Sequence, residues 1–203
     1  GKVWRQTYAR GEREGPLEQI GTTDHTGTRV TFHPDDQIFS TLEFSFDTLS
    51  QRLRELSFLN AGIRIQITDE RSSKSHDFCY DGGIVSFVEH RNRNRSPLHD
   101  SPILISGERD LPGNKSVSVS VEIALQYNDS YNESVYSFAN NINTVEGGTH
   151  LIGFRTALTR TVNRYLTANM KNGKGAPASV TGDDLREGLT AVISVKLPQP
   201  EFE

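Results

Sequence analysis

Residues 181–200 read Thr-Gly-Asp-Asp-Leu-Arg-Glu-Gly-Leu-Thr-Ala-Val-Ile-Ser-Val-Lys-Leu-Pro-Gln-Pro, and this stretch decides the fold of the C-terminal half. Thr181, followed three residues later by Asp184, has capping-box-like spacing and predicts the start of a short helix. The apolar run Leu189–Leu197 then predicts a buried strand. The prolines that follow end this strand, because proline cannot donate to a sheet ladder.

Upstream of this stretch, the chain alternates between strand and helix patterns. A helix is expected from about Thr149 to Met170, because its apolar residues recur on one stripe at helical spacing. Val117–Tyr127 has apolar residues at every second position and predicts a long strand, with shorter strands at Ile103–Ser106 and Val135–Ala139. The polar segment Asn169–Ala178 is expected to be a mobile loop. The order strand, strand, strand, helix, helix, strand is typical of an α+β domain.

The N-terminal half contains short alternating segments, then a helix and a hairpin. Strands are expected at Lys2–Ala9, Leu17–Ile20 and Thr28–Phe32. A helix is expected after an N-cap at Asp47, because leucines recur at helical spacing with charged residues on the other side. The alternating isoleucines that follow it, paired with Ser75–Tyr80, predict a β-hairpin.

Asp81-Gly82-Gly83 is the expected domain boundary. A sheet-like pattern stops at these residues and a new helical pattern begins directly after them. The sequence therefore predicts two domains, residues 1–82 and residues 83–203.

The composition is that of a globular protein. The 203 residues are 34% hydrophobic and 24% charged, with a formal charge of −4. The hydrophobic content excludes a disordered tail, and the 17 glycines are far too few for the one in three of a collagen. No apolar run approaches the ~20 residues of a membrane helix. The single cysteine, Cys79, excludes an internal disulfide and favours a reducing, cytoplasmic compartment. Because the chain opens without Met in strand-like sequence, we expect a fragment of a longer protein.

The sequence predicts no self-contained catalytic site and no metal site. The six histidines stand singly, without a second histidine or cysteine at metal-ligand spacing. No Gly-x-Ser-x-Gly nucleophile elbow is present. Asp183, Asp184 and Glu187 are clustered carboxylates, but at a helix start such residues are typical of capping and dipole compensation.

Two segments leave a choice between binding and structure. The basic run of Arg91, Arg93 and Arg95 is either a patch that contacts phosphates or a solvated loop that compensates a helix dipole. The paired glycines Gly147 and Gly148 either allow an anion to bind at the following helix N-terminus or form a sharp strand-to-helix turn. The residues alone leave both choices open.

Four strings, taken in order, carry a family resemblance. They are Thr26-Gly27-Thr28-x-Val30-x-Phe32-x-Pro34, Arg52-Leu53-Arg54-Glu55-Leu56-Ser57-Phe58-Leu59-Asn60, Glu146-Gly147-Gly148-Thr149-His150 and Gly182-Asp183-Asp184-x-Arg186-Glu187-Gly188-Leu189. Together they closely resemble the B subunits of bacterial DNA gyrase over essentially the whole chain. The B subunits of topoisomerase IV are the alternative, and the Arg-Glu-Leu-Ser-Phe-Leu-Asn string favours gyrase.

The resemblance implies a fold and a cofactor. Residues 1–82 would be the C-terminal part of a GHKL ATPase domain, an α/β sandwich. Residues 83–203 would be a transducer domain, a ribosomal-protein-like fold with a left-handed β-α-β crossover, which is an exception to the usual right-handed rule. ATP and Mg²⁺ are implied for the full-length protein, and Thr28 matches a threonine on the adenine side of its pocket. The family's other ATP-site motifs do not occur in this chain, and its Gln-Thr-Lys loop would follow Glu203, so no cofactor is expected on the fragment.

The resemblance also implies partners. Arg155 matches a family position on the wall of a dimer cavity through which double-stranded DNA passes, where a cation suits sequence-independent phosphate contact. The alternative for Arg155 is a helix-surface arginine paired with Glu146 or an aspartate. The gyrase A subunit is the implied protein partner, and dimerisation would depend on an N-terminal arm. We therefore expect this fragment to be a monomer, inactive alone, cytoplasmic and without a membrane partner.

The resulting hypothesis is a fragment of an ATP-dependent type IIA topoisomerase, an isomerase that introduces negative supercoils into DNA. The segment would couple ATP binding and hydrolysis to strand passage. The alternatives are a topoisomerase IV B fragment and a stand-alone DNA-binding or interaction module that uses the run from Arg91 to Arg95. That module would bind DNA alone in a salt-sensitive way, and the coupling fragment would have negligible ATP affinity.

Overall fold

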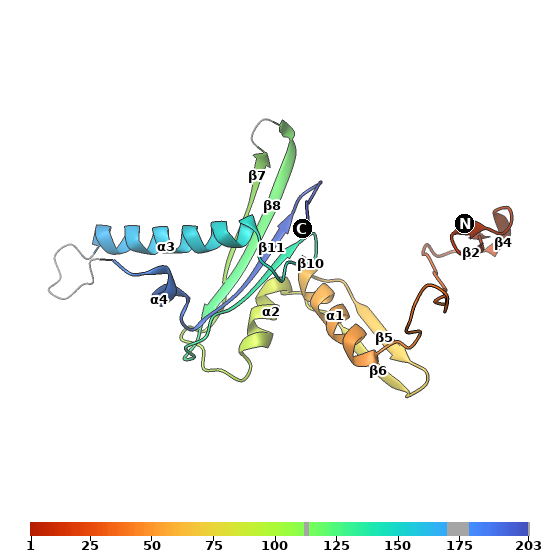
Figure 1. The fold of residues 1–203 in the computed structure, drawn as a ribbon, viewed down its shortest axis with the longest axis horizontal. Coiled ribbons are helices and arrows are strands. Elements are labelled where there is room, and N and C mark those ends of the chain that lie inside the picture. The colour runs from red at the N-terminus through yellow and green to blue at the C-terminus, as the bar shows by residue number, and fades with distance from the viewer. Residues whose placement is uncertain (112–113, 170–178, 203) are drawn as a thin grey trace. The chain divides into compact units, whose positions relative to one another are not determined.

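The computed structural model describes residues 1–111, 114–169 and 179–202 (Figure 1). The chain divides into two compact units, Gly1–Ser45 and Phe46–Glu203. The loop expected at Asn169–Ala178 lies, apart from its first residue, outside the described residues.

The first unit consists of two small antiparallel sheets and a stretch without helix or strand. Strand β1 (Lys2–Arg5) pairs with β4 (Glu18–Thr22), and β2 (Tyr8–Ala9) pairs with β3 (Glu12–Arg13). The expectation of a strand at 28–32 is wrong. No described strand pairs with this segment, and a period-2 pattern forms a strand only where another strand can accept its hydrogen bonds.

The second unit begins with a helix and a hairpin that confirm the sequence-based prediction. Helix α1 (Phe46–Leu59) is followed by the antiparallel pair β5 (Ile65–Asp69) and β6 (Lys74–Phe78). Asp47 lies inside the first turn of α1 rather than at its N-cap, so it faces the positive end of the helix dipole from within the helix. Helix α2 (Gly83–Asn92) starts directly after the expected boundary.

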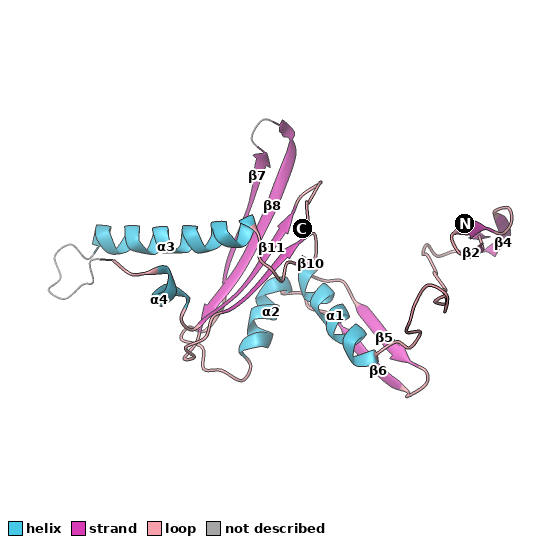
Figure 2. Ribbon diagram, viewed as in Figure 1, coloured by secondary structure: helices cyan, strands magenta, loops and turns pink. Residues whose placement is uncertain are grey.

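A five-stranded mixed sheet forms the centre of this unit (Figure 2), with strand order β10-β9-β11-β8-β7. Its strands are β7 (Ile103–Leu111), β8 (Asn114–Tyr127), β9 (Ser134–Ala139), β10 (Ile142–Asn143) and β11 (Leu189–Lys196). Strand β11 is antiparallel to β8 and parallel to β9. The connection from β9 to β11 passes through α3 (Thr149–Asn169) and α4 (Gly182–Arg186), which confirms a β-α-β crossover in an α+β fold. The left hand expected for this crossover stays a prediction.

The segment from Thr181 to Leu197 folds as its sequence predicts. The Thr181 hydroxyl accepts a hydrogen bond from the Asp184 amide, and the Asp184 carboxylate accepts one from the Thr181 amide, so a capping box starts α4. Seven consecutive residues of β11, Leu189 to Val195, are buried. A strand buried on both faces is a continuous apolar run because each face needs its own core.

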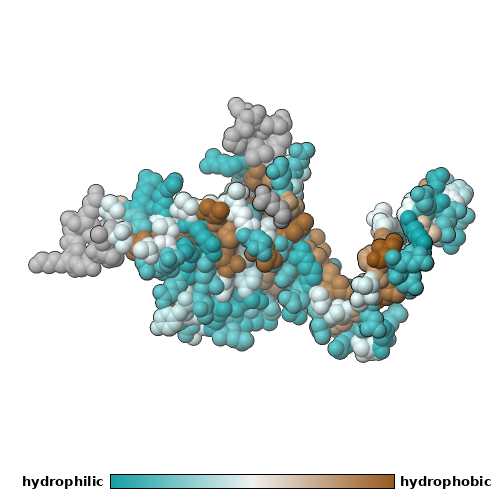
Figure 3. All heavy atoms as spheres, viewed as in Figure 1, coloured by the Kyte–Doolittle hydropathy of each residue, from teal (hydrophilic) through white to brown (hydrophobic). Residues whose placement is uncertain are grey.

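The two faces of the sheet are covered by different helices. Ala124 and Leu125 are successive residues of β8 and therefore point to opposite faces. Ala124 belongs to a core built mainly from α1 and α2, whose buried members are Phe58, Leu59, Ile84, Phe87, Val88, Ala124, Phe138 and Val192. Leu125 belongs to a core under α3, whose buried members are Leu125, Phe154, Leu189, Ala191 and Ile193. In the view of Figure 3, hydrophilic residues cover most of the surface around α2, as expected for a helix with its apolar side turned inward.

A buried polar network joins the end of α2 to the sheet. The Thr190 hydroxyl on β11 donates to Asn92 Oδ1 over 2.7 Å and accepts from Asn128 Nδ2 over 3.1 Å. Asn92 Nδ2 donates to Gln126 Oε1 over 2.9 Å. These four side chains are all buried, so their mutual hydrogen bonds offset the cost of removing them from water.

Candidate nucleic-acid interface

Helix α3 carries a row of positive charge. Arg155, Arg160 and Arg164 lie along it, and none of its 21 residues is an aspartate or glutamate. Phe154 packs into the core under the helix, so an apolar stripe faces the sheet. A helix with cations and no carboxylates favours contact with an anionic partner.

The arginines of α3 border a shallow groove beside α4. The hollow has a volume of about 420 Å³ and is lined by Arg155, Thr156, Thr159, Arg160, Asn163 and Arg186. Asn163 fixes the far wall, because its side chain donates to the Val180 carbonyl over 2.9 Å and accepts from the Val180 amide over 2.8 Å. Three guanidinium groups, from two helices separated in sequence, therefore meet at one groove.

Glu133 holds two of these guanidinium groups. Its carboxylate, in the connection between β8 and β9, accepts two-pronged hydrogen bonds from Arg155 over 2.9 to 3.0 Å. Arg186 lies 3.6 Å from the same carboxylate and also pairs with Asp183. The carboxylate that pairs with Arg155 is therefore Glu133, rather than the Glu146 or aspartate considered from the sequence.

Arg160 differs from its two neighbours in the groove. Among residues 1–111, 114–169 and 179–202 it has no carboxylate partner, and it is exposed. The groove therefore keeps one unpaired cation beside two cations that share a carboxylate. An incoming phosphate would meet Arg160 directly and would compete with Glu133 for Arg155.

The basic run at the end of α2 is not a single patch. The Arg91 guanidinium lies 4.5 Å from the centre of the Tyr136 ring, a cation–π contact. Arg95 turns to the sheet, where it donates to Thr190 Oγ1 over 3.1 Å and to Ser134 Oγ over 3.0 Å. Arg93 is exposed. Two of the three arginines therefore have partners within the chain, and a phosphate-binding role of the run stays a prediction.

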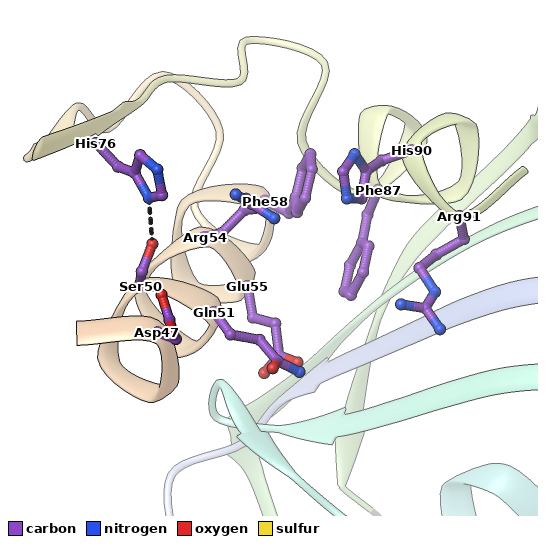
Figure 4. A pocket seen from close by; sticks show the side chains of 10 residues that line it. All are labelled: Asp47, Ser50, Gln51, Arg54, Glu55, Phe58, His76, Phe87, His90 and Arg91. Atoms are coloured by element: carbon purple, nitrogen blue, oxygen red, sulfur yellow. Dashed lines mark hydrogen bonds between the residues drawn. The ribbon is translucent and has the colours of Figure 1, made fainter. Parts of the chain in front are cut away.

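A second hollow of about 420 Å³ lies between α1 and α2 (Figure 4). Phe58 and His90 contact each other there, with ring centres 5.4 Å apart. Burial lowers the pKa of His90, and the neighbouring cations Arg93, Arg54 and Arg91 lower it further. His76 on the opposite wall shares a 2.6 Å hydrogen bond with Ser50. The carboxylates of Asp47 and Glu55 also line this hollow, so its walls carry both signs of charge.

The remaining sites expected from the sequence are simple to place. Thr28 is exposed and lies in the first unit, outside its strands. The paired glycines form a sharp turn before α3, with φ of 93° at Gly147 and 149° at Gly148. Within the described residues, no group of three or more His, Cys, Asp or Glu side chains could hold a metal ion. In the same residues, no helix combines the length and the apolar character that a membrane span requires.

A model of one protein family matches more than half of the chain. The family is described as DNA gyrase B, and the match covers residues 83–203. The chain belongs to this family. The resemblance to gyrase B subunits expected from the sequence is thereby confirmed.

Curated relatives agree with the family match over the whole chain. The DNA gyrase B subunit of Halalkalibacterium halodurans is 55% identical over 205 residues, covering 100% of this chain and 31% of the relative. The B subunit from Clostridium acetobutylicum gyrase is 53% identical over 209 residues, with the same coverage of 100% and 31%. This chain therefore spans about a third of the length of these relatives.

Solved structures of relatives share the fold. The 43K ATPase domain of Thermus thermophilus gyrase B, in complex with an aminocoumarin, has a TM-score of 0.83 and 40% identity, over 100% of this chain and 54% of that one. The topoisomerase IV ATP-binding domain of Francisella tularensis has a TM-score of 0.69 over 100% of this chain and 53% of that one. Its 22% identity shows a common fold and no more. These likenesses confirm the expected fold class.

Sequence reasoning did not find Glu133, Arg160 or Arg186 as members of the groove. Arg160 could have been found from the absence of carboxylates along α3, a pattern that is visible in the sequence. Glu133 carries no such signal, because it lies 22 residues before Arg155 in an ordinary turn. Its role follows only from the way the β-α-β crossover brings α3 beside the start of β9.

Proposed function

We propose that this chain is the part of a gyrase B subunit that couples ATP binding and hydrolysis to DNA strand passage. The enzyme would be a type IIA topoisomerase, an isomerase that introduces negative supercoils. Residues 1–82 would form the C-terminal part of the ATPase domain and residues 83–203 the transducer domain. The start of the family match at residue 83 supports this division, although the compact units of the structure meet at Ser45.

The observation that carries the proposal is the position of β11. This strand is buried along seven residues between β8 and β9, and it ends at Lys196. A strand held by neighbours on both sides moves only together with its sheet. A nucleotide-sensing loop joined to the end of β11 would therefore transmit a pull to the whole sheet and to α3, as a rigid-body or hinge change.

The groove beside α4 is the proposed DNA contact. Arg155, Arg160 and Arg186 present cations to one surface, and phosphate contacts of this kind are independent of base sequence. Transient contact suits a segment of DNA that must pass rather than stay. The Glu133 carboxylate supports this interpretation, because it reduces the net charge of the groove without removing the arginines.

The proposal includes the partners and cofactors of the full-length protein. ATP and Mg²⁺ would bind there, with Thr28 on the adenine side of the pocket. The A subunit would supply the DNA-cleaving tyrosine, and double-stranded DNA would be the substrate. A longer subunit would dimerise through an N-terminal segment, whereas the present chain would be a cytoplasmic monomer without ATPase activity.

The coupling role is tested in the full-length subunit reconstituted with its A subunit. Replacing Arg155 and Arg160 by glutamine should reduce DNA-stimulated ATP hydrolysis and supercoiling. Each lost phosphate contact should also reduce the slope of log affinity against log salt by about 1. The control replaces two exposed arginines of the basic run, Arg91 and Arg93, by glutamine and leaves Arg95 on the sheet. A larger loss of DNA binding in the control than in the groove variant would favour the stand-alone binding module instead.

Two further measurements test whether this chain alone is inactive and whether the full enzyme is a gyrase. Intact mass and ATP turnover, measured on the same sample of this chain, should give 22.7 kDa and no turnover. Turnover at that mass would contradict the coupling role. A reconstituted enzyme that passes DNA strands without introducing negative supercoils would favour the topoisomerase IV alternative.

A further inference from the structure

The two-residue turn between β9 and β10 is left-handed at both positions, as in a type I′ hairpin turn. Asn140 and Asn141 both lie in the left-handed region, with φ of 47° and 66°. Residues other than glycine rarely adopt this conformation, and asparagine is among the few that tolerate it. Two such residues in succession fix the directions of two side chains, which leave the turn toward different parts of the fold.

Asn140 is bound to the end of β11. Its side-chain Nδ2 donates to the Leu197 carbonyl over 2.7 Å, and its Oδ1 accepts from the Leu197 amide over 2.9 Å. Its backbone amide donates to the Val195 carbonyl over 2.9 Å. The regular pairing of β9 with β11 ends at Ala139 and Val195. The Asn140 amide therefore acts as one additional peptide unit and holds the chain just after β11 ends.

Asn141 is bound to α1. Its backbone carbonyl accepts a 2.7 Å hydrogen bond from the Arg52 guanidinium, and its Nδ2 donates to Asn60 Oδ1 over 3.2 Å. Asn60 in turn donates to the Leu56 carbonyl over 2.7 Å, so it is part of the helix end. The turn is therefore attached to α1 at two points, about two helical turns apart.

These contacts meet at two adjacent residues. Helix α1 lies more than 80 residues before the turn in sequence, and Leu197 lies 57 residues after Asn140. Within the described residues, Asn141 Oδ1 is buried without a hydrogen-bond partner, so the turn keeps this geometry at some cost. A turn that served only to reverse the chain would not need either attachment.

We propose that Asn140 and Asn141 are positioning residues that link α1 to the end of β11. The inference rests on the proposed function, in which the chain after Leu197 leads to the nucleotide-sensing loop and α1 belongs to the ATPase domain. A displacement of either segment is conveyed to the other through the turn. Loss of the link leaves α1 and β11 packed in their common core but lets the chain after β11 move relative to α1, so ATP hydrolysis continues while strand passage becomes less efficient.

The test uses the full-length subunit reconstituted with its A subunit. Asn140→Gly removes both side-chain bonds to Leu197 and keeps the left-handed backbone, because glycine adopts this conformation freely. The number of ATP molecules hydrolysed per supercoil introduced should rise about five- to tenfold, as the loss of two neutral hydrogen bonds would give. Ser73→Gly is the matched control, because Ser73 is also left-handed, with φ of 57°, in the exposed β5–β6 turn. It should leave the ratio unchanged.

The outcomes separate the link from the proposed function. If the unmodified enzyme couples ATP to supercoiling and Asn140→Gly behaves like Ser73→Gly, the link is wrong and the proposed function stands. If the unmodified enzyme neither hydrolyses ATP nor supercoils DNA, the proposed function fails and the link fails with it.

A second variant separates positioning from a merely structural role. Asn140→Asp keeps the side-chain shape and the acceptor for the Leu197 amide but loses the donor to the Leu197 carbonyl. It should raise the same ratio while ATP hydrolysis continues, although the carboxylate that faces the Leu197 carbonyl lowers its Tm. A parallel fall of Tm, ATP hydrolysis and supercoiling in both Asn140 variants would show that the turn only supports the fold, and would overturn the proposal.

A double-mutant cycle tests whether the two attachments act together. Arg52→Ala and Asn60→Ala together remove both contacts of Asn141 with α1, and Asn140→Gly removes the side-chain contacts with Leu197 after β11. If the turn conveys movement, the effects on the coupling ratio should not add, and the variant that combines both changes should resemble the variant with either change alone. Additive effects would contradict a link through the turn.

Discussion

Helices α2 and α3 cover opposite faces of one sheet, yet they are built differently. The ten residues of α2 include five that are buried, namely Gly83, Ile84, Phe87, Val88 and Asn92. Among the 21 residues of α3, Phe154 is the buried one. The shorter helix is therefore part of the core on nearly every turn, whereas the longer helix touches the sheet along a narrow stripe.

The difference indicates that the two faces of the sheet have different roles, stability on the α2 side and contact with a partner on the α3 side. The α2 face combines an aromatic core with a buried polar network, and both fix the sheet against α1 and α2. The α3 face leaves most of its helix in solvent, where arginines gather beside α4. Burial stabilises the first face, and the second face remains available for a partner.

The largest expected effect is a loss of stability when a buried aromatic side chain is removed from the α2 face. Phe87 on α2 is 4% exposed and stacks on Phe58, with ring centres 4.8 Å apart. Phe87→Ala should lower the free energy of unfolding by about 3–5 kcal/mol, because it leaves a cavity. Tyr165 on α3 is 64% exposed, so Tyr165→Ala should stay within about 0.5 kcal/mol. Urea unfolding of both variants checks this, and equal losses would refute the difference in roles.

A smaller effect concerns the buried polar network. Thr190→Val keeps the side-chain shape but removes the hydroxyl that serves Asn92, Asn128 and Arg95. The free energy of unfolding should fall by about 1–3 kcal/mol, the cost of leaving buried polar groups unpaired. The control is Thr161→Val on the exposed side of α3, for which thermal unfolding should detect almost no change. A Thr190 variant as stable as the parent would show that the network does not stabilise the α2 face.

The next effect appears in DNA binding rather than in stability. Glu133→Gln removes the negative charge shared by Arg155 and Arg186. In the full-length subunit, the DNA concentration that half-stimulates ATP hydrolysis should fall about threefold, the scale of one partly exposed ion pair. Glu89→Gln makes the same charge change on the exposed side of α2 and should have no such effect. If the two variants behave alike, α3 is not the DNA-facing side.

The smallest effect is a dependence of stability on pH. Burial lowers the pKa of His90 on α2 and of His150 on α3 below the ordinary value of 6.5, and nearby arginines lower that of His90 further. The unfolded chain therefore binds a proton at these sites before the folded chain does. Their contribution to stability is present above pH 6.5 and is lost as the pH falls through the lowered folded-state pKa.

Replacing either histidine by glutamine should therefore make the midpoint of urea unfolding fall less steeply as the pH is lowered from 7.5 to 5. His90→Gln should have a larger effect than His150→Gln, because only His90 combines burial with nearby cations. A steeper decline in either variant would contradict the sign of the shift. An equal change in both variants would show that the arginines beside α2 do not lower the pKa of His90.

The sequence alone determined most of the elements. Leucine spacing placed α1, alternation placed β5 and β8, and the Thr181 capping box with the apolar run after it placed α4 and β11. These signals are local, since helix periodicity, caps and strand alternation act within a few residues. Thr28–Phe32 shows the limit: its alternation is as regular as that of a strand, but strand formation also needs a partner elsewhere in the chain.

Only the tertiary structure decided which side chains meet. The resemblance pointed to Arg155, but its pairing with Glu133, the groove shared with Arg186 and the double attachment at Asn140 and Asn141 all join residues far apart in sequence. Such pairs leave no periodic signal, because either partner alone looks like an ordinary surface residue. Local chemistry therefore determined what this chain forms, and the return of the chain through the β-α-β crossover determined where its charges and its links lie.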